Sequence, residues 1–329
     1  MRVMTNTKYQ DVFDLIIIGS GISGLSAARM SVQMGKSVLV IDKGRRIGGR
    51  CSTKRQDGAT FNHGAQFFTC KDTDFSALIK KAQEAGAAHQ WEFGHHAPAF
   101  GGAPTMRDLP QFLADDSDFT LLQNVTITQI NEAPTTTQAT ESARYHLYDQ
   151  DGIGYYCRQL VITTPAPQAE KLLAPLNPAL AKTAASAVYD PCWTVMLALE
   201  APLDAAAFPL RDKGMIGWAN YEPLRNASHY APALTIQASP AASNDMLSWD
   251  KEEVIGALVA SCEEVIGQKL MISFSLAHRW LYARVSQSAD ATLPFITDDK
   301  TLALAGDYFG TARLETAFLS GRRAAQALG

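Results

Sequence analysis

The sequence of 329 residues lacks the features that mark several large classes of protein. It has no run of 18 consecutive apolar residues, so we expect no membrane-spanning helix. It has no basic block, and its formal net charge is −4, so composition does not favour nucleic-acid binding. The charged fraction of 19% is low and the apolar fraction is 47%, which is enough for a sizeable core and predicts about two domains.

Cysteine is scarce and scattered. The five cysteines, an odd number, form no CxxC pair, which favours reduced thiols in a cytoplasmic protein. The histidines are not spaced with the cysteines as zinc ligands, and the one close pair, His95-His96, lies in a Gly/Pro-rich stretch, so no metal is expected. The first 14 residues are polar and lack the apolar segment of a secretory signal.

The first fifty residues contain the most informative motif of the sequence, a glycine-rich loop between an expected strand and an expected helix. The apolar run DLIII at 14–18 predicts a buried parallel strand, and GSGISG follows at 19–24. Apolar residues at helical spacing then continue to Gly35, and SVLVIDK at 37–43 predicts a second buried strand. This strand–loop–helix–strand order predicts a right-handed crossover between parallel neighbours.

Each glycine of the loop has a physical role in binding a dinucleotide. Gly19 allows the sharp turn, Gly21 lets the backbone approach a pyrophosphate, and Gly24 allows close packing of helix on strand. The start of the helix adds unpaired N–H donors and a partial positive charge. Asp42, at the end of the second strand, is placed to accept hydrogen bonds from ribose hydroxyls.

The rest of the chain predicts an α/β protein, α+β overall, in which a Rossmann-type domain is interleaved with a mixed-sheet substrate domain. We expect helices at 73–88, 104–116, 251–267 and 312–328, and two helical pieces within 165–189. A loop is expected up to about residue 105. Strands are expected at 121–133, 143–152 and 154–164 as a β-meander, and at 192–200, 214–222, 233–239 and 273–285. Residues 301–310 predict a strand that runs into a tight turn.

Two motifs resemble the flavin-containing amine oxidase superfamily. GRRIGGR at 44–50 resembles its RxxGGR segment, and AGD at 305–307 with RLETAFLSG at 313–321 resembles its C-terminal flavin motif. The resemblance implies non-covalently bound FAD, with Arg50 reaching phosphate or the flavin edge and Asp307 contacting the ribityl chain. The helix after Asp307 would point its N-terminus at the pyrimidine ring and stabilise the negative charge of reduced flavin.

The resemblance and the glycine loop together assign these residues to FAD: Gly19, Gly21, Ile22, Ser23, Gly24, Asp42, Lys43, Gly49, Arg50, Gln66, Phe67, Val125, Gly306, Asp307 and Glu315. Both ends of the chain would then meet on one cofactor, so the FAD-binding domain is expected to be discontinuous. We assign it residues 1–69, 105–165 and 291–329, and we assign the substrate domain residues 70–104 and 166–290.

Within this superfamily, three segments resemble the renalases, particularly the short bacterial ones. They are FNHGAQFFT at 61–69, TPAPQA at 164–169 and HRWLYA at 278–283. The resemblance implies an oxidase of dihydronicotinamide isomers, 2- or 6-dihydro-NAD(P), that gives NAD(P)+ and, with O2, H2O2. Hydride transfer from such a donor needs mainly positioning, which agrees with the lack of a catalytic triad or paired-carboxylate motif.

The residues expected to position this substrate are Gln66, Phe67, Asn220, Trp280 and Tyr282. Trp280 would stack on the nicotinamide or pack in the core, and Arg225 or Arg279 would meet the donor's phosphates or form surface salt bridges. Two departures leave the substrate open. Asn62 stands where an acid is expected, and WANYEPLR at 218–225 follows the family's substrate-facing segment only loosely.

Two other functions remain open. One is an amine oxidase or carotenoid-type desaturase on the same scaffold, although the chain is short for either. The other is a flavin-binding protein without turnover. The sequence has no second dinucleotide fingerprint, which argues against a two-nucleotide reductase. The expected partners are a small dinucleotide substrate and O2, with no nucleic acid and no membrane, for a monomer or homodimer.

Overall fold

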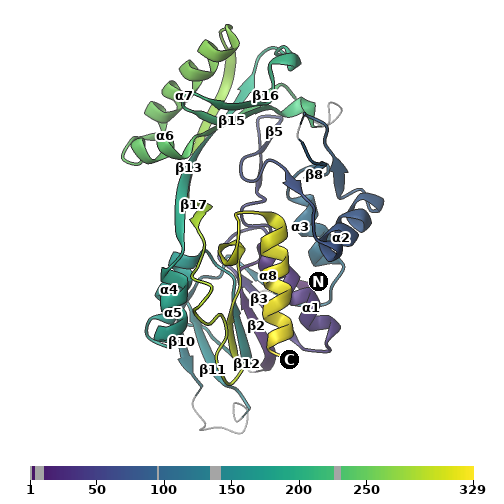
Figure 1. Ribbon diagram of the computed structural model, residues 1–329, viewed down its shortest axis with the longest axis vertical. Coiled ribbons are helices and arrows are strands. Elements are labelled where there is room, and N and C mark those ends of the chain that lie inside the picture. The colour runs from purple at the N-terminus through teal and green to yellow at the C-terminus, as the bar shows by residue number, and fades with distance from the viewer. Residues whose placement is uncertain (1, 4–10, 95, 134–141, 226–230) are drawn as a thin grey trace.

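The computed structural model describes residues 2–3, 11–94, 96–133, 142–225 and 231–329 (Figure 1). His95, one half of the histidine pair, lies outside the described residues. The described chain forms a larger part built on one sheet and a smaller part built on another, joined by two long strands (Figure 1).

The larger part is built on an eight-stranded sheet with the order β1-β9-β3-β2-β12-β11-β10, in which β18 also pairs with β12. Strands β2 and β3 are parallel neighbours, and β10, β11 and β12 form an antiparallel meander, which confirms both predictions. The strands are β1 (Arg2–Val3), β2 (Val12–Ile18), β3 (Val38–Asp42), β9 (Thr120–Gln123), β10 (Ile127–Glu132), β11 (Tyr145–Asp149), β12 (Gly154–Ile162) and β18 (Leu302–Leu304).

Helices cover both faces of this sheet, which is why its central strands are apolar throughout. On β2, Leu15 and Ile17 pack in one core, and Ile16 and Ile18 pack in the core on the other face. The first core includes α1 (Ile22–Gln33), α2 (Thr73–Glu84), α3 (Asp108–Asp115) and α8 (Leu314–Ala327). The second core includes α4 (Ala166–Leu173) and α5 (Pro178–Ala185).

The closing helix α8 lies directly against the first helix α1 (Figure 1). A Cβ at Gly321 would lie 2.0 Å from the carbonyl oxygen of Ser23, so only glycine permits this approach. The Ser26 hydroxyl donates to the carbonyl of Phe318 at 2.7 Å across the same contact. The two ends of the chain therefore share one packed interface.

The smaller part is a five-stranded antiparallel sheet with the order β14-β15-β16-β13-β17. Its strands are β13 (Val188–Leu199), β14 (Leu210–Lys213), β15 (Ile216–Tyr221), β16 (Ala233–Ala238) and β17 (Ile272–Gln287). Helices α6 (Pro240–Asp245) and α7 (Lys251–Ile266) pack on one face. Helix α7 begins at a capping box of Asp250 with Glu253 and ends at Gly267, whose φ is +67°.

Some short elements were not expected. The segment expected as a loop between residue 88 and about 105 contains β7 (Ala88–Gln90) and β8 (Ala99–Gly102), and β8 also pairs with β6 (Phe68–Thr69) to complete a three-stranded sheet. A hairpin of β4 (Thr53–Gln56) and β5 (Ala59–Asn62) precedes it. Strands of two to four residues are too short to show a period of two. Short 3-10 helices lie at η1 (Ala205–Ala207), η2 (Glu222–Leu224) and η3 (Asp307–Phe309).

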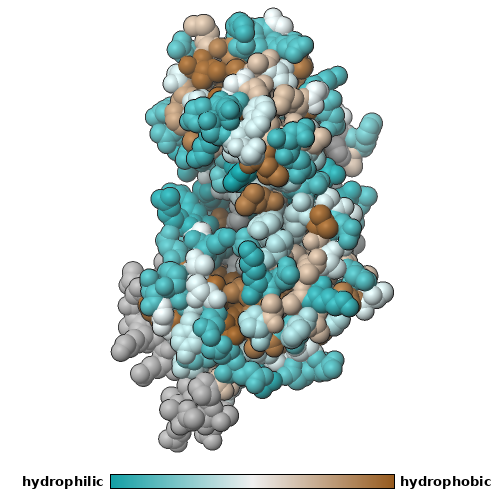
Figure 2. Space-filling model, turned by 90° about the vertical axis from the view of Figure 1, so that its left-hand side faces the viewer, coloured by the Kyte–Doolittle hydropathy of each residue, from teal (hydrophilic) through white to brown (hydrophobic). Residues whose placement is uncertain are grey.

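The strand expected over 121–133 is two strands, β9 and β10, which are not neighbours in the sheet. Asn124 lies between them at a φ of +59°, a turn conformation that asparagine tolerates. On the side of the molecule that carries β13 and α4, polar residues predominate and apolar ones occur in small groups (Figure 2). Within the described residues, no helix is both long and apolar enough to cross a bilayer.

Candidate flavin site

The glycine loop lies between the end of β2 and the start of α1. Gly19 has a φ of +109°, and a Cβ at Gly24 would lie 1.9 Å from the Gly19 carbonyl oxygen, so both positions require glycine. A Cβ at Gly21 would meet no protein atom within 4 Å. Packing within the protein therefore does not require glycine at position 21, and the space next to its Cα is open to a ligand.

The first turn of α1 is suited to a phosphate group. No side chain in the described part of the chain caps this helix at Gly21, so its first N–H groups are available as donors. The Ser23 hydroxyl is buried and has no hydrogen-bond partner among the described residues. An anionic oxygen would satisfy both, so the residues present fit a dinucleotide pyrophosphate. Ile22, the first residue of the helix, packs in the core beneath.

Asp42, the acid predicted to bind ribose, is held in place by the loop. One oxygen of Asp42 accepts from the amide and the hydroxyl of Ser20 at 2.5 and 2.7 Å, and the other accepts from the amide of Gly44 at 2.6 Å. The amide of Val125 donates to the Asp42 carbonyl at 3.0 Å, which places Val125 next to the predicted ribose position. Lys43 extends to Gln168, with Nζ 3.0 Å from Oε1.

The GGR segment packs directly on the glycine loop. The amide of Gly48 donates to the Ser20 carbonyl at 2.9 Å, and a Cβ at Gly49, whose φ is +51°, would lie 3.5 Å from the Cα of Gly21. This segment carries Arg50 toward the other end of the chain. The Arg50 guanidinium donates to both carboxylate oxygens of Asp307, at 2.8 and 2.7 Å.

This bidentate pair joins the two flavin motifs across 257 positions of sequence. The Asp307 side chain is 7% exposed and that of Arg50 is 31% exposed. The neighbouring amide of Gly306 donates to the Ser320 hydroxyl of α8 at 3.0 Å. Glu315 accepts from the amides of Lys71 and Asp72 at 2.6 and 2.8 Å, so its carboxylate holds the loop before α2.

Gln66 is fixed by the protein itself. Its Nε2 donates to the carbonyls of Asn62 and Gly64 at 2.5 and 3.0 Å, and its Oε1 accepts from Arg225 Nη2 at 2.7 Å. Arg225 also donates to the Gln66 carbonyl at 2.6 Å and, through Nε, to Glu222 at 3.1 Å. The side-chain amide of Gln66 is thus bonded to the protein at both its nitrogen and its oxygen. These bonds fix the backbone that leads into Phe67.

Arg225 therefore differs from both roles weighed for it, phosphate binding and a surface salt bridge. Its side chain is 2% exposed, and Glu222, its partner, is fully buried. Glu222 also accepts from the amide and side chain of Asn62, each at 3.1 Å, and from the hydroxyl of Thr235 at 2.5 Å. An acid is thus paired with Asn62 in space, and no sequence signal beyond the segment 218–225 pointed to it.

Four aromatic rings cluster beside Gln66. Phe67 lies 5.0 Å from Phe93 and 5.3 Å from Trp218, and Trp91 lies 4.3 Å from Phe93, between ring centroids. The Arg211 guanidinium lies over Phe93 and Trp218, at 4.7 and 5.3 Å from their centroids. Of these residues, Phe67 was predicted as a site residue and Trp218 belongs to the loosely matching segment 218–225, whereas Trp91, Phe93 and Arg211 belong to no motif.

The other predicted positioning residues lie on two strands. Asn220 is on β15, two residues beyond Trp218, and is fully buried. Trp280, on β17, donates from Nε1 to the carbonyl of His63 at 2.9 Å and stacks on the His63 ring at 5.5 Å. Burial and the neighbouring His278 lower the pKa of His63 to about 3, so this imidazole is neutral.

Tyr282 lies two residues further along β17, with its ring 5.9 Å from that of Tyr189. Tyr189 in turn lies 5.8 Å from the Arg50 guanidinium, so β17 leads from the Trp280 region to the Arg50–Asp307 pair. Arg279 lies over Trp193, whose ring packs in the core beneath α7, so it points away from this face. Among the described residues, no group of three or more His, Cys, Asp or Glu is placed to hold a metal ion.

The fold and the site define a dinucleotide-binding flavoprotein. Residues 17–82 match the NAD(P)-binding Rossmann-like domain, and residues 82–329, three quarters of the chain, match flavin containing amine oxidoreductase. The chain therefore belongs to the flavin-containing amine oxidoreductase family, whose members are FAD-dependent oxidoreductases.

Curated relatives match over shorter stretches. The chain is 36% identical over 94 residues to an inactive all-trans-retinol 13,14-reductase of Danio rerio, and 38% identical over 66 residues to putrescine oxidase of Kocuria rosea. These stretches are 28% and 20% of this chain, and 15% and 14% of the relatives' lengths. The chain thus aligns with only a small share of each of these proteins.

A solved structure matches over nearly the whole chain. It is the crystal structure of "Putative protoporphyrinogen oxidase" from Exiguobacterium sp. 255-15, with a TM-score of 0.73. The match covers 95% of this chain and 97% of the other, at 12% identity, so it shows a shared fold.

The open space above Gly21 gives a direct test of this site. We expect Gly21→Val to fold normally and to bind FAD at least about tenfold more weakly, because the new side chain meets the cofactor and no protein atom. The measurements are flavin content after purification, FAD titration of the apoprotein, and thermal unfolding. Gly256→Val, at an exposed and equally open position of α7, is the control and should leave FAD binding unchanged.

Proposed function

We propose that the protein oxidises a dihydronicotinamide, 2- or 6-dihydro-NAD(P), to NAD(P)+, with O2 as the final acceptor and H2O2 as product. When bound, FAD supplies the hydride acceptor and returns two electrons to O2. The overall reaction consumes one proton for each dihydronicotinamide and O2. The resemblance of segments 61–69, 164–169 and 278–283 to the renalases supports this assignment.

The observation that carries the proposal is the charge around the aromatic cluster. The guanidinium of Arg211 covers Phe93 and Trp218, and that of Arg225 lies 4.3 Å from the centroid of Trp91. A cation therefore already lies over Phe93, Trp218 and Trp91, three of the four rings that would otherwise attract an ammonium group. A substrate with a neutral dihydropyridine ring and anionic phosphates would be attracted to these cation-covered rings, whereas a protonated amine would be repelled by the guanidinium groups.

The protein's part in this reaction is to hold the donor. Phe67 and Trp218 would bound the flat ring, Asn220 would orient it, and Gln66, locked by Arg225, would keep Phe67 in place. Trp280 and Tyr282 would line the path along β17 toward the Arg50–Asp307 pair. Such positioning supplies most of what a hydride transfer requires.

The domain division is part of the proposal. The FAD-binding domain would comprise 1–69, 105–165 and 291–329, and the substrate domain 70–104 and 166–290. The apolar contacts of α4 and α5 with the eight-stranded sheet favour moving residues 166–185 to the FAD side. We also propose a cytoplasmic enzyme that acts as a monomer or homodimer.

The test is anaerobic mixing of the FAD-loaded protein with borohydride-reduced NAD+ or NADP+, followed in the visible flavin band. We expect rapid bleaching by a 2- or 6-dihydro isomer and recovery of the band when O2 is admitted. Ordinary 1,4-dihydro-NAD(P)H serves as the control for isomer selectivity. Absence of bleaching with every isomer would rule the proposal out.

Amine oxidation is the second candidate, because the matched family and a matched relative, putrescine oxidase, point to amines. An oxygen-consumption screen with primary and polyamine substrates separates it from the first. Oxygen uptake with an amine, without bleaching by dihydronicotinamides, would favour it.

A further inference from the structure

Two side chains on β15 have polar atoms without partners. Asn220 is fully buried, and neither its Nδ2 nor its Oδ1 has a hydrogen-bond partner among the described residues. The Nε1 of Trp218, a residue 9% exposed, is also without one in this part of the chain. Buried amide and indole groups are ordinarily bonded, so two unpaired neighbours call for a physical explanation.

The two residues face the same side of the sheet. Ala219 and Tyr221, which alternate with them, pack in the core that includes α7. Trp218 and Asn220 therefore point to the opposite face, toward segment 62–67. Other polar groups on that face are bonded to the protein. Gln237 donates to the Gly64 carbonyl at 2.7 Å, and Thr235 donates to Glu222 at 2.5 Å.

One of the two residues, Trp218, is itself a member of the aromatic cluster. The Trp218 ring lies 5.3 Å from Phe67 and 5.5 Å from Phe93, between ring centroids. Flat apolar walls next to unpaired donors and an acceptor suit a flat ring that bears one polar substituent.

We infer that Asn220 and Trp218 form a subsite for the carboxamide of the substrate ring. This inference rests on the proposed function. Asn220 offers two N–H donors and one acceptor, and Trp218 offers one N–H donor. A carbonyl oxygen satisfies the donors, and an amide N–H satisfies Oδ1. An ammonium group, which only donates, would leave the donors unpaired, and a carboxylate, which only accepts, would leave Oδ1 unpaired.

The first test separates a ligand site from a structural role. Asn220→Leu replaces the unpaired amide by an apolar group of similar size. We expect the thermal midpoint of the ligand-free protein to stay level or rise, because no native hydrogen bond is lost. A residue that holds the fold through its amide would instead lower the midpoint.

The second test uses two neutral ring probes, nicotinamide and 3-acetylpyridine, which differ in the N–H donors of the carboxamide. Binding to the oxidised FAD-loaded protein is followed by perturbation of the flavin spectrum. We expect the wild type to prefer nicotinamide roughly tenfold, the value of about one hydrogen bond, and Asn220→Leu to lose this preference. Asn244→Leu, an exposed asparagine on α6, is the control and should keep it.

Two results would overturn the inference. One is a preference for nicotinamide that Asn220→Leu retains, with or without a fall in its thermal midpoint, and the other is failure of the wild type to bind nicotinamide. Nicotinamide binding with the expected preference, but without flavin reduction by any dihydronicotinamide, would overturn the proposed function and leave the subsite standing.

Discussion

Asp307→Asn is expected to weaken FAD binding by roughly thirtyfold, because it leaves the Arg50 guanidinium without its bidentate partner. Breaking a fully buried pair costs about 3–5 kcal/mol. Since the Arg50 side chain is 31% exposed, solvent screening reduces this to about 2 kcal/mol. We expect this cost to appear in FAD binding because the cofactor would be held by the two motifs only in their paired arrangement. The measurement is FAD titration of the apoprotein, followed by quenching of flavin fluorescence.

Two further variants sharpen this test. Arg50→Lys keeps the charge but loses the planar fork, so an intermediate loss of affinity is expected. Asp298→Asn, at an exposed position of the same C-terminal segment, should change nothing. An FAD affinity for Asp307→Asn equal to that of the wild type would show that the pair does not hold the two ends of the chain on the cofactor.

The largest loss of stability is expected from Glu222→Ala. It removes the counter-charge of the Arg225 guanidinium, 2% exposed, and it also removes the carboxylate that accepts from Nδ2 of Asn62 and from the hydroxyl of Thr235. Removing one partner of such a pair costs about 3–5 kcal/mol of unfolding free energy. The measurement is the thermal and urea midpoint of the FAD-loaded protein.

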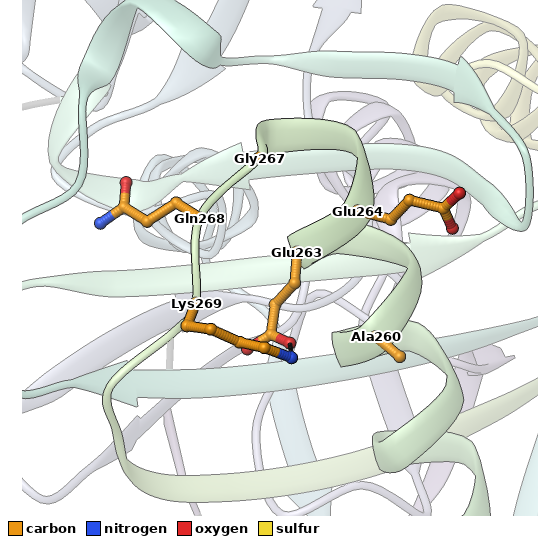
Figure 3. A pocket seen from close by; sticks show the side chains of 6 residues that line it. All are labelled: Ala260, Glu263, Glu264, Gly267, Gln268 and Lys269. Carbon is orange, nitrogen blue, oxygen red and sulfur yellow. Dashed lines mark hydrogen bonds and ion pairs between the residues drawn. The ribbon is translucent and has the colours of Figure 1, made fainter.

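The matched control is an ion pair on the surface. Lys269 Nζ, just beyond the end of α7, lies 2.5 Å from Glu263 Oε2, and the Lys269 side chain is 89% exposed. Figure 3 shows the two side chains side by side. Lys269→Met should therefore cost at most about 1 kcal/mol. The double variant Glu222→Leu with Arg225→Met removes both buried charges and should lose less stability than Glu222→Ala alone. Equal losses for the buried and the exposed variants would contradict the argument.

The sequence alone predicted those parts of the site that lie in contiguous motifs. Gly19, Gly24 and Asp42 are fixed by local geometry, because a sharp turn, a close helix–strand contact and a strand end each follow from neighbouring residues. The meeting of Arg50 and Asp307 was implied by two motifs that resembled one family. At Gly19 and Gly24 any side chain would clash with the backbone or strain it, so the two glycines mark this loop in the sequence.

Short strands and buried partners could not be predicted in the same way. Strands β6 to β8 are too brief to show a period, and Asn124 divides a run that looked continuous. Trp91 and Arg211 belong to the aromatic cluster only because separate segments fold together there. Nothing in their local sequence distinguishes them from core or surface residues.

The sequence by itself therefore determined two things about this protein. Its fractions of charged residues and cysteine are low, and it carries a dinucleotide loop near one end and a flavin motif near the other. Only the tertiary structure decided that Arg225 is buried against Glu222 and that Asn220 lies unpaired beside Trp218. The physical reason is that a turn or a helix start depends on adjacent residues. Burial of a charge, or the absence of a hydrogen-bond partner, depends on residues brought together from across the fold.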